Sequence, residues 1–64
     1  IPHYNFRGGI TITKSVSMTS SLDQLIRDFS SEMGVTQRVI VEAALIQFME
    51  KYGYARQVRK LLDG

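Results

Sequence analysis

The chain has 64 residues and a net charge of +2, so it holds at most one small domain. It contains no cysteine, which excludes disulfide bridges and thiolate metal sites, and its one histidine, His3, lies near the N-terminus. No apolar run approaches the roughly 20 residues that a membrane helix needs. We therefore expect a cytoplasmic protein that has no membrane segment, metal or cofactor.

The N-terminal third of the sequence predicts an arm followed by one β-strand. Residues 1–10 have no periodicity and contain Pro2 and the Gly8–Gly9 pair, so we expect a flexible arm. Residues 11–18 alternate between apolar and hydroxyl side chains, which is typical of a half-buried strand. A lone strand leaves its backbone groups without partners. We expect it to pair antiparallel with the same strand of a second copy across a two-fold axis.

Two longer helices follow the strand. Apolar residues at helical spacing predict an amphipathic helix over residues 20–33, with N-cap candidates at residues 19–21. Gly34 is expected to end this helix in the left-handed conformation, and Thr36 to cap a second helix over residues 37–52. That second helix is apolar nearly all round, and the chain is too short to cover it. This pattern favours a homodimer.

Beyond Gly53, residues 54–62 place Tyr54, Val58, Leu61 and Leu62 on one side and three basic residues on the other. We expect a short third helix within a C-terminal segment of residues 54–64, which needs to dock because about 10 residues make a marginal helix alone. The fold class is therefore mainly α with one strand per chain. The expected dimer core is Val16, Met18, Leu22, Leu25, Ile26, Phe29, Ile40, Val41, Ala44, Leu45 and Phe48.

The order of strand, helix, Gly34-Val35-Thr36 turn and apolar helix resembles the ribbon-helix-helix (MetJ/Arc-type) family of DNA-binding proteins. The resemblance covers residues 11–52, within an expected domain of residues 11–53, although no proline follows the strand and Gln37 stands where a basic residue is common. It implies an intertwined homodimer that lays a two-stranded ribbon into the major groove of DNA. It also implies a small transcriptional regulator, such as a repressor, in the cytoplasm of a prokaryotic cell or a virus-infected host.

By this resemblance, Thr13, Ser15 and Ser17 face base edges, where hydroxyls both donate and accept hydrogen bonds. The alternative is a solvated polar face of the dimer ribbon. The start of the second helix, with Thr36, Gln37 and Arg38, suits a phosphate, because helix N-termini present unbonded N–H groups.

Two further cations are candidates for contacts with the DNA backbone. Arg7 precedes the glycine pair of the arm and can reach a phosphate from there. Lys14 alternates with Ile12 and Val16, so its side chain falls on the apolar side of the strand. It either extends past the edge of the ribbon to a phosphate or lies at the edge of the core.

A second hypothesis keeps the dimer but assigns residues 54–62 to a protein partner, as in antitoxins of this fold. The third helix would alternatively join dimers into a higher assembly. We do not expect an enzyme, because catalysis needs titratable groups that converge, and the acids are spread along helix surfaces.

Overall fold

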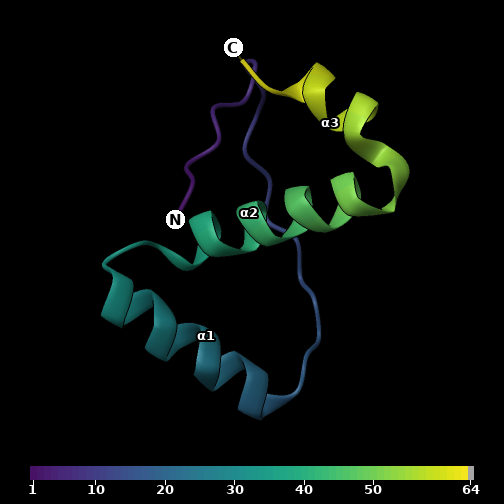
Figure 1. The fold of residues 1–64 in the computed structure, drawn as a ribbon. Coiled ribbons are helices and arrows are strands. Elements are labelled where there is room, and N and C mark those ends of the chain that lie inside the picture. Colours follow the sequence, from purple (N-terminus) through teal and green to yellow (C-terminus); the bar gives the residue numbers. More distant parts are fainter. Residues whose placement is uncertain (64) are drawn as a thin grey trace.

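The computed structural model describes residues 1–63, which form a mainly helical chain (Figure 1). Helix α1 spans Ser20–Met33, α2 spans Gln37–Met49 and α3 spans Ala55–Leu61, and the kinked segment Glu50–Tyr54 joins α2 to α3. Helix α2 runs through the middle of the molecule, with α1 on one side and α3 on the other (Figure 1). Its two sides therefore have different neighbours.

The corner between α1 and α2 is built by local rules. Gly34 adopts the left-handed conformation (φ 67°, ψ 30°), and its N–H donates to the carbonyl of Ser30 at 3.0 Å. Thr36 caps α2, because its hydroxyl oxygen accepts a hydrogen bond from the Val39 N–H at 3.2 Å. Both expectations are confirmed. The N-cap of α1 is Thr19, but its side chain makes no capping hydrogen bond.

The corner between α2 and α3 is made by a break in the helical backbone. Tyr52 (φ −104°, ψ 27°) and Gly53 (φ 96°, ψ 9°) leave the helical conformation, so the chain turns after Lys51. Helix α2 is bounded at Met49, while Glu50 still has helical dihedral angles (φ −61°, ψ −41°), and the backbone departs from the helix at Tyr52, the residue at which the helix was expected to end. Val58 is then buried against α2, with 2% of its surface exposed.

The arm and the predicted strand both differ from the expectation. Within residues 1–63 the one β-type pairing is an antiparallel bridge between Phe6 and Leu62. The Arg7 N–H donates to the Leu61 carbonyl at 2.8 Å, and the Asp63 N–H donates to the Asn5 carbonyl at 2.7 Å. The sequence suggests a flexible arm, whereas residues 5–7 are held here because this pairing satisfies their backbone groups.

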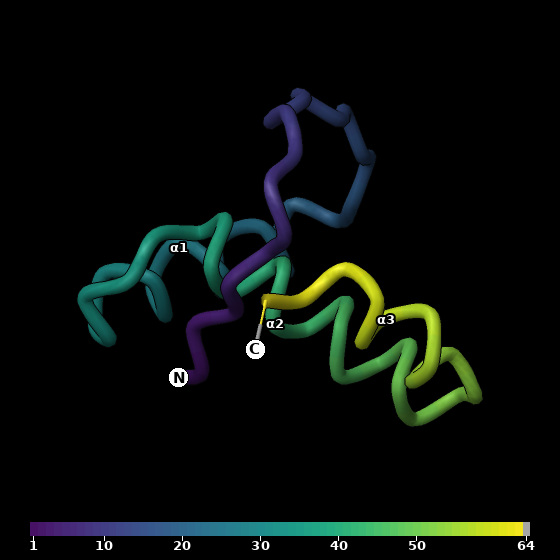
Figure 2. Tube along the Cα trace, turned by 90° about the horizontal axis from the view of Figure 1, so that it is seen from above, coloured from purple at the N-terminus to yellow at the C-terminus, as the bar shows by residue number. Residues whose placement is uncertain are grey.

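Residues 11–18 form no strand in the single chain. In Figure 2 this stretch (blue) stands away from the helices before it returns to the start of α1. A strand exists only beside another strand, since its N–H and C=O groups bond across the ladder. One copy of the chain offers residues 11–18 no such neighbour among the residues that the structure describes.

Candidate functional site

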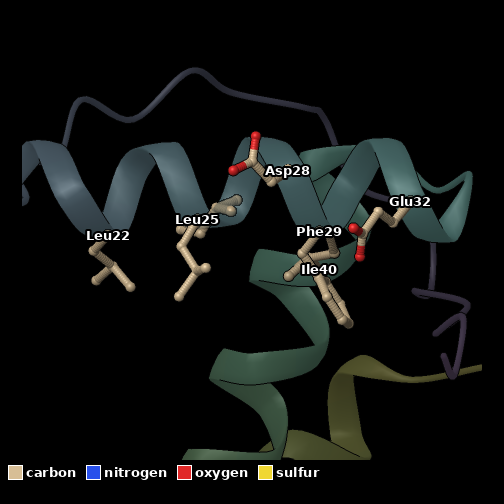
Figure 3. Close-up of a pocket in the computed structure, with 7 residues that line it drawn as sticks. Leu22, Leu25, Asp28, Phe29, Glu32 and Ile40 are labelled. Carbon is tan, nitrogen blue, oxygen red and sulfur yellow. The ribbon is translucent and has the colours of Figure 1, made fainter.

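A groove opens between α1 and the start of α2. It has a volume of about 490 Å³ and is lined mainly by apolar side chains. Figure 3 shows Leu22, Leu25 and Phe29 projecting from α1 on the side where Ile40 of α2 lies, while Asp28 projects the other way. The amphipathic pattern of residues 20–33 thus turns its apolar stripe towards α2.

This stripe is not covered by the chain itself. Leu25 is 63% exposed and Phe48, on α2, is 62% exposed. None of the eleven residues expected in the dimer core is buried in the single chain, and only Ile26 and Ile40 are even half-buried. We call these eleven residues the uncovered face: Val16, Met18, Leu22, Leu25, Ile26, Phe29, Ile40, Val41, Ala44, Leu45 and Phe48.

The opposite side of α2 is covered by the chain. Ala43 and Ile46 are buried, and with Val58 they make up the buried apolar core among the described residues. Phe6 of the arm and Leu61 of α3 line the same small cavity as Ile46 and Val58. Residues two positions apart on a helix point in nearly opposite directions. Ile46 is therefore buried while Phe48 is exposed.

The expected base-contacting residues, Thr13, Ser15 and Ser17, are all exposed. They lie on the stretch that stands away from the helices (Figure 2). Lys14 on the same stretch is exposed as well. In the single chain the hydroxyl side chains are therefore open to solvent, and so are the apolar side chains between them.

At the start of α2, the three expected phosphate-contacting residues have different surroundings. The Thr36 hydroxyl is engaged as a cap with the Val39 N–H, while Gln37 is exposed. The Nε of Arg38 lies 3.3 Å from a carboxylate oxygen of Glu42, one turn later in the helix. A phosphate at this helix end would therefore compete with Glu42 for the guanidinium group.

Arg7, also expected to contact a phosphate, does not lie near the start of α2. Its Nε donates to the Leu62 carbonyl at 3.0 Å, so the side chain sits at the C-terminal end of α3 rather than at the start of α2. This contact joins residues 55 positions apart. Nothing in the spacing of residues 1–10 indicates it, because the sequence pattern reports local structure and this pairing is not local.

The described residues offer neither a metal site nor a membrane span. Among residues 1–63, no three histidine, aspartate or glutamate side chains lie close enough together to hold a metal ion. None of the helices within the same residues has the length and apolar content required to cross a bilayer.

The site therefore combines an uncovered apolar face, an exposed row of hydroxyls and a capped helix N-terminus with an arginine beside it. Comparisons with protein-family models, with curated proteins and with solved structures found no match to this chain.

Proposed function

We propose that this chain is a ribbon-helix-helix protein that works as a homodimer and binds double-stranded DNA. In this arrangement residues 11–18 of two copies pair as an antiparallel ribbon, and the uncovered faces of both copies pack together. One observation carries the proposal: nine of the eleven residues of the uncovered face are exposed, along α1, α2 and the stretch before them. Large apolar side chains that are gathered on one side of two helices and left in water mark an interaction surface.

A second copy fits this surface better than an unrelated partner. Pairing identical strands gives hydrogen-bond partners to the backbone groups on one edge of residues 11–18, and the same two-fold axis brings identical apolar stripes together. A 64-residue chain without disulfides also needs additional buried surface to be stable. A dimer would therefore pair the strands, cover the apolar stripes and add the buried surface that a small chain lacks.

The DNA-binding part follows from what the ribbon would leave exposed. Thr13, Ser15 and Ser17 would form one polar face that is narrow enough, as a two-stranded ribbon, for the major groove. The N-terminus of α2 would take a phosphate and set the register on the duplex. A regulator of transcription is the function class that these features support.

The alternative is a protein-binding role for residues 54–62. The burial of Val58 against α2 favours a docked third helix over a segment that waits for a partner. Hydrogen exchange distinguishes the two roles, because amides of α3 are protected in the dimer alone only if the helix is docked there.

The experiment is a selection of bound duplexes from a random pool, read at two salt concentrations. The parent protein is expected to enrich one sequence family and to lose affinity steeply as salt rises. The Ser15→Ala and Ser17→Ala variants are expected to lose on the order of 1 kcal/mol per subunit on that sequence and to relax its preference. Ser31→Ala, an exposed hydroxyl on the outer side of α1, serves as the control and is expected to change neither.

Unchanged sequence preference in both ribbon variants would contradict the ribbon readout. The ribbon itself is checked by introducing a single cysteine at Ser15, since the chain has none of its own. Cross-strand neighbours lie close enough for a disulfide. Ser15→Cys is therefore expected to form a covalent dimer on mild oxidation, while Gln57→Cys on α3 is not.

A further inference from the structure

The basic residues of this chain are concentrated at α3. Residues 54–62 hold three of the eight basic side chains and no acid, whereas residues 11–53 hold four basic and five acidic side chains, a net charge of −1. The part of the chain that resembles a DNA-binding fold is therefore not the basic part. A duplex is a dense line of negative charge, and its binding depends on neutralising phosphates.

The three basic side chains of residues 54–62 lie on one surface of α3. Val58 points from α3 into α2, and Arg56 and Lys60 lie two positions before and after it, four apart from each other. This spacing puts both on the side of α3 opposite Val58, with Arg59 beside them. All three are exposed, and the salt bridges among residues 1–63 involve Arg27 and Arg38 instead. We call Arg56, Arg59 and Lys60 the basic face.

The N-terminal arm links the basic face to the proposed ribbon. Phe6 pairs with Leu62, and Arg7 donates to the carbonyls of both Leu61 and Leu62. Only the glycine pair and Ile10 then separate Arg7 from residue 11. The backbone pairing thus ties the C-terminal end of α3, directly after Arg59 and Lys60, to the start of the stretch that would enter the groove.

We propose that the basic face of α3, together with Arg7, contacts the phosphate backbone of the DNA that flanks the ribbon site. This inference rests on the proposed function and adds a second contact surface to it. The contact neutralises phosphates and reads no bases, so it adds affinity on every sequence. Charge complementarity selects this occupant, since the three exposed cations outnumber the one acid that follows them in the chain, Asp63, and would repel a second copy of the same face.

The test uses the full chain and two duplexes, one trimmed to the selected site and one extended by about 10 base pairs on each side. The parent protein is expected to bind the extended duplex more tightly. A triple variant, Arg56→Gln with Arg59→Gln and Lys60→Gln, is expected to bind both duplexes alike. Its plot of log affinity against log salt is expected to flatten by about 0.9 for each phosphate that the variant no longer neutralises.

Two control variants test whether the loss of duplex-length preference and of salt dependence comes from the basic face itself. Lys51→Gln removes one exposed charge outside the basic face, above the ring of Tyr52, and is expected to leave the preference for the extended duplex intact. Replacing Arg59 by Lys and Lys60 by Arg keeps the charges and is expected to retain the parent's salt slope. Circular dichroism verifies that each variant folds.

The outcomes are distinct. If Ser15→Ala alters sequence preference while the triple variant keeps the parent's slope and length dependence, the basic-face proposal is overturned and the DNA-binding function stands. If the triple variant changes only the association of dimers with each other, a second copy is the occupant and the proposal is also overturned. If the parent binds no duplex, both proposals fall together.

Discussion

The two sides of α2 show how differently one helix can be covered. On one side, Ile46 is buried by α3 and the N-terminal arm, and 4% of its surface remains exposed. On the other side, Phe48 lies against the ring of Tyr52, 4.7 Å away between centroids, and is otherwise largely open. The chain thus completes one half of its core and leaves the other half unfinished. This asymmetry is the basis for inferring a second copy.

The largest expected effect comes from placing a charge on the uncovered face. Leu25→Lys is nearly harmless if this face stays in water, but costs about 3–5 kcal/mol if a second copy buries it, because the ammonium group has no partner there. Sedimentation and thermal unfolding measure the outcome. Ser31→Lys adds the same charge to the outer side of α1 and is expected to change stability by less than about 0.5 kcal/mol. Equal behaviour of the two variants would show that the face is not buried.

The next largest effect is expected on the side of α2 that α3 and the N-terminal arm cover. Ile46→Ala is expected to cost about 2–5 kcal/mol, since it leaves a cavity beneath Val58. Amides of α3 are expected to lose protection from hydrogen exchange in this variant, while the dimer keeps its stoichiometry. Gln57→Ala, at an exposed position of α3, is the control. Full protection of α3 in Ile46→Ala would mean that the arm rather than α2 holds this helix.

A smaller effect is expected at the turn that joins α1 to α2. Thr36→Ala removes the capping hydrogen bond to the Val39 N–H and is expected to cost about 1 kcal/mol in the free energy of unfolding. Thr19→Ala is the matched control, because the Thr19 side chain makes no such bond. Denaturant unfolding of both variants, with Thr36→Ser as a rescue, measures the difference. Equal losses would indicate that the cap at α2 is not what stabilises the turn.

The smallest effect is expected from Glu42→Gln. The salt bridge to Arg38 is exposed, and such pairs contribute no more than about 0.5 kcal/mol on a helix. Under the proposed function this variant binds DNA more tightly than the parent, because Arg38 no longer divides its charge between Glu42 and a phosphate. Fluorescence anisotropy with a labelled duplex measures this change. Weaker binding would place Arg38 away from the DNA.

The sequence predicts the local parts of this fold well. The bounds of α1 match the expected residues 20–33 because the apolar stripe and Gly34 both define them. The cap at Thr36 and the break at Gly53 follow from the same kind of short-range rule. The pairing of Phe6 with Leu62 was not predictable in this way, since it joins two ends of the chain.

Only part of the candidate site can be predicted from the sequence. Alternation in residues 11–18 indicates a strand, but the neighbour proposed for it belongs to another copy, and the single chain leaves the strand unformed. The excess of apolar residues on α2 predicts that something must cover it, and the structure shows which side is left open. The location of Arg7 on Leu62 depends on tertiary pairing and had no signal in the sequence.

Sedimentation equilibrium combined with circular dichroism over a wide range of protein concentrations tests the central claim most directly. If two copies cover each other's open faces, the protein has twice the mass of one chain when folded, and its helicity falls as dilution separates the copies. A single chain that keeps its full helicity at high dilution would contradict the account, because it would show that the uncovered face needs no partner.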